Sequence, residues 1–132
     1  DQLSRNIHRG DPETYAADAQ ARAHAEAAIE RGQDLELPPR QRLFVYMPLE
    51  HSEDLGDQER CVERVRALAE AVAADPDATP EQRKQYAGYI GYAIAHRDIV
   101  ARFGRFPHRN ALLGRESTPE EREFLTQPGS SF

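Results

Sequence analysis

The apolar residues of this 132-residue chain recur at helical spacing. In the segment after Ser52, the residues Leu55, Val62, Val65 and Val72 follow one another at steps of seven, three and seven, which puts them on one face of a helix. No segment alternates apolar and polar residues over the length of a strand between turn signals, so no sheet is expected. The pattern predicts an all-α fold, an array of antiparallel helix pairs made of about five helices.

Helix boundaries follow from capping signals. The cap residues Asp11, Thr79 and Thr118 are each followed by proline and then glutamate, an order that suits the first turn of a helix. Gln82 and Glu121 complete capping boxes with the two threonines. Together with stops at glycine or before proline, these signals predict helices over residues 12–31, 39–47, 52–74, 80–103 and 119–125.

The same spacing indicates which helix faces are buried. The first helix should bury a stripe of small side chains at every fourth position from Tyr15 to Ala27, and the second should turn Phe44 inward. In the longest helix Gly88 and Gly91 lie about one turn apart. This spacing favours a close crossing with a neighbouring helix.

Composition narrows the class of protein. Hydrophobic residues make up 39% of the chain and charged residues 30%, which suits one helical domain over residues 1–132. The chain has no apolar run long enough to cross a membrane and no secretory signal pattern, and Cys61 is its single cysteine. These features predict a cytoplasmic protein with no membrane partner, and the net charge of −6 argues against a nucleic-acid partner.

The charge is unevenly distributed. Residues 96–115 carry five arginines against one acid, a local charge of +4. After a helix stop at Gly104, this segment presents a cluster of donors: Arg105, His108, Arg109, Asn110 and Arg115. A guanidinium group binds carboxylates and phosphates through two parallel hydrogen bonds, so the segment is a candidate anion site. The sequence leaves open a second interpretation, in which these arginines cap helix ends and pair with the acidic helices.

Polar residues also occur on faces that should be buried. His96 shares a helical stripe with apolar residues, and His51 and Gln58 share a face with Val62. Buried polar side chains need hydrogen-bond partners, and the arginine-rich segment could supply them. Each residue also has an alternative without a functional role. His96 would be an ordinary core histidine, and His51 would simply precede a helix start capped by Ser52.

Other templates for catalysis or metal binding are absent from the sequence. No glycine-rich phosphate loop and no HExxH, CxxC or GxSxG pattern occurs, and Cys61 has no adjacent base to activate it. His51, His96 and His108 are metal ligands by residue type, but their spacing matches no metal motif and nearby arginines oppose a cation. We therefore expect no metal site and no cofactor.

Three stretches resemble a known family: DQLSRNIHRG, LPPRQRLFVYMPLEHSEDLGDQE and HRDIVARFGRFPHRNALLGRESTPEEREFL. They are similar to the signature motifs of the uncharacterised bacterial proteins called domain of unknown function 924, of the TPR-like superfamily. The resemblance implies a fold of helical hairpins and brings no established activity. It adds Arg5 and Asn6 to the candidate site, because both lie in the first motif. Family members are typically longer, so we expect this chain, which begins at Asp1, to lack an N-terminal segment.

Three functions fit these observations. The first is a binding module for a small anionic ligand or an acidic peptide. The second is a hydrolase or lyase that acts on an anionic substrate with histidine as general acid or base. The third is a protein-association scaffold with a purely structural network of Arg and His. The candidate ligand-binding residues are Arg5, Asn6, His51, Gln58, His96, Arg105, His108, Arg109, Asn110 and Arg115.

Overall fold

The computed structural model describes residues 2–8 and 10–131, with side chains from Arg5 onward, and this part of the chain contains helices and no strand. Asp1, where the first family motif begins, lies outside the described residues. The α-helices are α1 (Gln2–Ile7), α2 (Asp18–Glu30), α3 (Pro39–Glu50), α4 (Leu55–Ala74), α5 (Pro80–Phe103) and α6 (Pro119–Phe124), with 3-10 turns at Pro12–Tyr15, Gln33–Glu36 and Pro107–Arg109. The predicted all-α class is confirmed.

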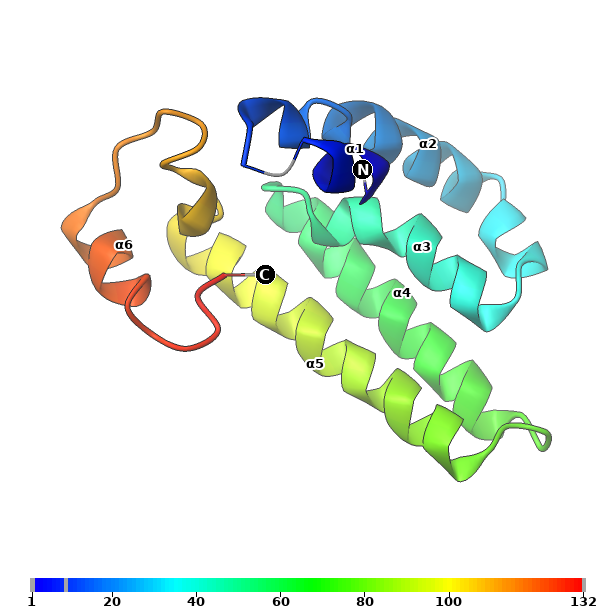
Figure 1. Ribbon diagram of the computed structural model, residues 1–132. Coiled ribbons are helices and arrows are strands. Elements are labelled where there is room, and N and C mark those ends of the chain that lie inside the picture. Colours follow the sequence, from blue (N-terminus) through cyan, green and yellow to red (C-terminus); the bar gives the residue numbers. More distant parts are fainter. Residues whose placement is uncertain (1, 9, 132) are drawn as a thin grey trace.

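From α2 to α5, helices that follow one another along the chain lie side by side (Figure 1). The longest pair is α4 and α5, joined by a short connection, while α3 packs on α4 and α2 packs on α3. Because α3 and α5 both rest on α4 but contact each other little, a mainly apolar groove that includes Phe44, Tyr89 and Tyr92 opens between them. After α5 the chain turns away from the axis of that helix and forms the short α6 (Figure 1).

The capping signals fix two helix starts as predicted. At α5 the Thr79 hydroxyl accepts the Gln82 N–H at 3.1 Å, and the Gln82 side chain accepts the Thr79 N–H at 2.8 Å. The same reciprocal arrangement of Thr118 and Glu121 begins α6. Gly104 ends α5 in the left-handed conformation, with φ of 69°, which favours glycine. The bounds of α5 are therefore those that the sequence predicts.

The predicted helix over residues 12–31 is wrong at its start. The Asp11 side chain does cap a backbone N–H, but it begins only the 3-10 turn Pro12–Tyr15. Thr14 is buried in this turn and donates its hydroxyl to the carbonyl of His8. The bond folds the turn back on α1, a helix that the sequence does not predict, and α2 begins only at Asp18.

Two expected packing features are also wrong. The stripe from Tyr15 to Ala27 does not form the buried face of α2, because the turn before α2 separates Tyr15 from the helix and Ala25 is the buried alanine. No close crossing occurs at Gly88 and Gly91, where an added methyl group would meet no described neighbour within 4 Å.

The helix α3 continues beyond its predicted end. Pro48 lies inside it, and the helix ends at Glu50 with His51 as its C-cap. Phe44, which should point inward, is 58% exposed, whereas Tyr46 on the other side of the helix is buried. Because α3 continues past Pro48, Glu50 and His51 lie at its C-terminal end, where the His51 carbonyl accepts a hydrogen bond from Arg109 of the loop after α5.

The core lies between α3, α4 and α5 and extends into the loop after α5. Its buried members are Tyr46, Leu49, Cys61, Val62, Val65, Leu68, Val72 and Ala93, with a smaller cluster of Ile99, Val100 and Phe106. Elsewhere the helices carry polar faces. Within the described residues no helix has the length and apolar character needed to span a bilayer.

We expect Leu68→Ala on α4 to lower the free energy of unfolding by about 2–5 kcal/mol, because it removes buried methyl groups and leaves a cavity. Leu68 is 2% exposed. The matched control is Leu35→Ala, the same change at a side chain that is 61% exposed, with an expected loss below about 0.5 kcal/mol. Urea unfolding followed by circular dichroism measures both variants, and equal losses would contradict this position of the core.

Candidate functional site

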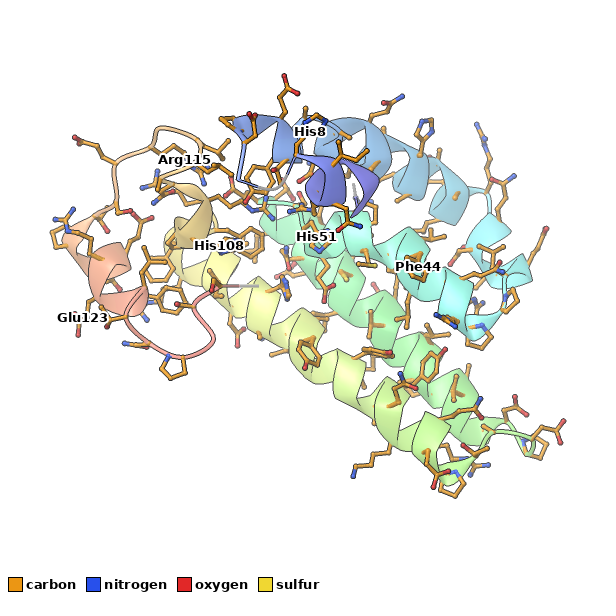
Figure 2. All side chains as sticks on the ribbon, viewed as in Figure 1. His8, Phe44, His51, His108, Arg115 and Glu123 are labelled. Atoms are coloured by element: carbon orange, nitrogen blue, oxygen red, sulfur yellow. The ribbon has the colours of Figure 1, made fainter. Side chains whose placement is uncertain are left out.

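A cavity of about 400 Å³ lies where α1, the turn Pro12–Tyr15, the end of α3, α5 and the loop after α5 meet. It is lined by Arg5, Asn6, Gly10, Thr14, Tyr15, His51, His96, His108, Arg109 and Leu112. Figure 2 shows two of these side chains, His51 at the end of α3 and His108 on the loop after α5, in the same region of the molecule. Six of the predicted site residues therefore share one cavity: Arg5, Asn6, His51, His96, His108 and Arg109.

The other four predicted site residues do not line this cavity and bind other parts of the chain. Gln58 is fully buried and donates from Nε2 to the backbone carbonyls of Glu50, at the end of α3, and of Ser52, in the turn that follows. Arg105, Asn110 and Arg115 donate to carboxylates of the same chain. These residues hold the segments around the cavity in place.

Arg109 brings a buried positive charge to the cavity wall, with 6% of the residue exposed. Its Cζ atom lies 4.7 Å from the ring centroid of Tyr15 and 4.4 Å from that of Phe106, so the guanidinium makes cation–π contacts with two aromatic rings. Its Nη2 donates at 2.9 Å to the carbonyl of His51, at the negative end of α3. Burial lowers the pKa of Arg109, which shows that the protein environment solvates this cation less well than water does.

Arg5 and Arg109 share one carboxylate. Oδ2 of Asp18, at the start of α2, lies 2.6 Å from Nη2 of Arg5 and 3.9 Å from Nη1 of Arg109. The Arg5 guanidinium also packs 5.0 Å from the ring centroid of Tyr15. None of the described residues that line the cavity is acidic. The two guanidinium groups therefore give its wall an excess of positive charge, which favours an anion.

Three neutral histidines complete the wall. The ring centroids of His51 and His96 are 6.2 Å apart, and Phe106 contacts both His96 and His108, with centroids 5.8 and 5.6 Å away. Burial, aided by the charges of the nearby arginines, lowers the pKa of each of the three histidines to about 4. At pH 7 the imidazoles are uncharged, and each offers one donor and one acceptor nitrogen.

Glu53 fastens the loop after α5 to the turn between α3 and α4. Its carboxylate accepts the Phe106 N–H at 2.8 Å and two hydrogen bonds from Arg115, at 2.7 and 2.9 Å. Burial would raise the pKa of Glu53, but these hydrogen bonds outweigh it and lower the pKa. Ser52 is not the cap of α4 as expected: Asp54 is the N-cap, and the Ser52 hydroxyl accepts the Asp54 N–H and donates to the Asp57 carboxylate in the first turn of α4.

Glu121 holds the far end of the same loop. It is 2% exposed and accepts two hydrogen bonds from Arg105, at 2.7 and 2.8 Å, one from Asn110 at 3.2 Å and one from the Thr118 N–H at 2.8 Å. The hydrogen bonds from Arg105 are the main reason that the pKa of Glu121 falls to about 2. The interpretation of the basic segment as an internal ion-pair network therefore holds for Arg105 and Arg115, whereas Arg109 faces the cavity.

One group of side chains beside the cavity has the chemistry of a metal site. Glu50, His51 and His96 each offer a ligand atom within 4.8 Å of the other two. Oε1 of Glu50 lies 3.7 Å from Nδ1 of His96, and burial raises the pKa of Glu50. A carboxylate with two imidazoles is a donor set that suits Zn²⁺ and related ions.

Sequence reasoning does not identify several residues on which the site depends. Tyr15 reads as a member of an apolar helix stripe, yet its ring packs against two guanidinium groups. Asp18 pairs with Arg5 across 13 positions, and Glu53 pairs with Arg115 across 62. No local pattern marks such pairs, since both acids are ordinary members of helix starts until the fold brings the arginines to them.

We expect Glu53→Gln to lower the free energy of unfolding by about 2 kcal/mol, because it removes the charge that accepts three hydrogen bonds and leaves Arg115 without a carboxylate. Glu59→Gln, an exposed glutamate on α4, is the matched control and should change stability by less than about 0.5 kcal/mol. Urea unfolding measures both. A Glu53→Gln variant as stable as the control would show that the contact does not hold the loop.

We also expect stability to fall as the pH drops from about 6.5 to about 4. His51, His96 and His108 have pKa values lowered to about 4 in the folded chain, below the ordinary value of 6.5. The unfolded chain therefore binds more protons in this window, and each histidine contributes up to about 1.4 kcal/mol per pH unit. The raised pKa of Glu50 acts in the opposite direction, so the slope must be compared between variants.

The comparison uses His96→Asn and, as its matched control, His24→Asn, which alters an exposed histidine of α2. His96→Asn should reduce the slope of unfolding free energy against pH by about 1.4 kcal/mol per pH unit, and the control should keep the wild-type slope. Urea unfolding at several pH values gives each slope. A wild-type slope in His96→Asn would mean that His96 is not held neutral by the fold.

The chain is similar to known proteins over nearly its whole length. Residues 1–129 match a family described as bacterial protein of unknown function, DUF924. A solved structure, that of the protein of unknown function ATU0120 from Agrobacterium tumefaciens, has 42% sequence identity and a TM-score of 0.77, and the match covers 95% of this chain and 61% of that protein. None of the curated proteins matches the chain. The matched residues show that the chain belongs to the DUF924 family.

Proposed function

We propose that this chain is a binding module for a small anionic molecule, which Arg5 and Arg109 hold in the cavity. The observation that carries the proposal is the buried guanidinium of Arg109. Among the described residues Asp18 is its one carboxylate within 4 Å, at 3.9 Å, and Asp18 lies closer to Arg5. A buried cation is costly unless it is paired, and an anion in the cavity would complete the pairing.

The packing of Arg109 supports the same proposal. Contacts with the Tyr15 and Phe106 rings, together with the bond to the His51 carbonyl, hold the guanidinium in one orientation before any ligand arrives. A donor that is already ordered loses little conformational entropy on binding. The same burial lowers the pKa of Arg109, which means that it disfavours the charged guanidinium in the absence of a ligand. Recognition of an anion therefore accounts for this arrangement better than stability alone does.

The size of the cavity favours a small ligand over a peptide. Its volume of about 400 Å³ lies at the lower end of the roughly 300–1,000 Å³ typical of ligand cavities. Carboxylate or phosphate groups on a compact molecule fit this volume. The neutral histidines add donors and acceptors that would fix the orientation of the ligand.

An enzyme is the second candidate function, because His51 and His108 line the same cavity as the arginines. In that case the chain would be a hydrolase or lyase with histidine as general acid or base. The pKa values of about 4 favour binding over this chemistry, since acid–base catalysis is most effective when the pKa lies near the working pH.

We infer a TPR-like arrangement and a cytoplasmic location as the setting of this site. Consecutive helices that pack side by side support the first inference. The second is supported by the single cysteine, buried in the core, since disulfide-rich chains are typical of secreted proteins.

A set of free anions tests the proposal: phosphate, pyrophosphate, succinate, citrate and an acidic tetrapeptide, each added to protein freed of metal on a chelating resin. At least one small anion should raise the melting temperature, with about 2.7 kcal/mol of stabilisation at 100 times its dissociation constant. Arg109→Lys keeps the charge but loses the planar fork, and should weaken that binding by about tenfold or more in calorimetry.

Arg66→Gln, which removes an exposed charge from α4, controls for net charge and should keep the wild-type affinity. Arg5→Gln provides a second site variant if Arg109→Lys folds poorly, as judged by circular dichroism. No stabilisation by any of these anions, or equal affinity in the site variants and the control, would overturn the proposal.

A further inference from the structure

The cluster of Glu50, His51 and His96 combines two elements of the fold at one point. Glu50 is the last residue of α3 and His51 its C-cap, while His96 lies in the second half of α5. One ligand atom from each side chain lies within 4.8 Å of the others. Tetrahedral ligands about 2.0–2.1 Å from zinc lie roughly 3.4 Å apart, so small side-chain movements would bring these three to coordination distance.

We propose that Glu50, His51 and His96 bind a divalent transition-metal ion of the Zn²⁺ class. Two imidazoles and one carboxylate form a three-ligand set that leaves a coordination position open. His51 and His96 also line the cavity, so an ion held there would border the space that the anion is proposed to occupy. This inference goes beyond anion binding and does not depend on it.

The surroundings of His96 support the proposal. Nδ1 of His96 lies 2.9 Å from the carbonyl oxygen of Tyr92. A hydrogen bond from Nδ1 to a backbone carbonyl fixes the ring of a metal-binding histidine and leaves Nε2 as the ligand atom.

The nearby arginines oppose a cation, which is why the sequence favours no metal at His51, His96 and His108. The cluster in the structure differs from that set, since the carboxylate of Glu50 replaces the ring of His108. One negative charge in the ligand set offsets one guanidinium. Glu50 is itself mostly buried, with 18% of its side chain exposed, and a carboxylate that is costly to ionise alone gains most from a cation beside it.

Isothermal titration of metal-free protein with Zn²⁺, and the visible absorption of bound Co²⁺, test this site. We expect one ion per chain and the absorption of a low-coordinate Co²⁺ without a thiolate band, since Cys61 is not in the cluster. Glu50→Gln and His96→Gln should each weaken Zn²⁺ binding by about 100-fold. Glu59→Gln and His24→Gln, both at exposed positions, are the matched controls and should bind as the wild type does.

Circular dichroism and the melting temperature establish that each variant folds. Glu50→Gln alters a side chain that is 18% exposed, against 8% for His96, and serves if His96→Gln does not fold. Absence of Zn²⁺ binding in the wild type would overturn the proposal. So would equal loss of binding in the site and control variants, or a Co²⁺ spectrum of an octahedral, water-coordinated ion. Anion binding by metal-free protein is a separate measurement, so either proposal can fail while the other stands.

Discussion

The geometry of the cavity depends on one charged contact, the Glu53 carboxylate against the loop after α5. Glu53 stands just before α4 and accepts both the backbone N–H of Phe106 and the guanidinium of Arg115. With the loop held there, the Phe106 ring is fully buried, and His108 and Arg109 line the cavity. The same ring contacts His96 and Arg109. The Phe106 ring therefore belongs both to the packing at the end of α5 and to the support of the cavity wall. A shift of one would move the other.

The arginines of residues 96–115 serve two different purposes. Arg102, Arg105 and Arg115 pair with glutamates, and these pairs fix α6 and the loop against the helices. Arg109 has no such close carboxylate among the described residues, and aromatic rings take up its faces. A local charge of +4 thus overstates what a ligand would meet. Most of that charge is neutralised by the acids that surround the segment, and the excess at the cavity comes from Arg109 and from Arg5 in α1.

The features that the sequence predicts are those that a few neighbouring residues decide. The start of α5 follows from Thr79 and Gln82, and its end from Gly104, so its bounds are confirmed. The turn at Thr14 is set by a bond to His8 and by burial, which no local pattern reveals. Periodicity does not show which side of α3 meets α4, since Phe44 is exposed and Tyr46 is buried, and the continuation of α3 through Pro48 has no local signal either. Residue type is enough to select six site residues that the fold brings to one cavity. The different roles of Arg109 and Arg105 depend on partners far along the chain, such as Glu121 for Arg105.

Charge couples the two proposed ligands of the cavity. Arg5 and Arg109 help to depress the pKa of the histidines, so their field reaches the atoms that would hold a metal. An anion beside the guanidinium groups would cancel much of that field and make a cation at Glu50, His51 and His96 less costly. A bound cation would in turn attract the anion, since the coupling free energy between two sites acts equally in both directions. Burial is the main cause of the low histidine pKa values, and the positive charge of Arg5 and Arg109 adds to it. Each ligand would therefore act on the other through that excess positive charge.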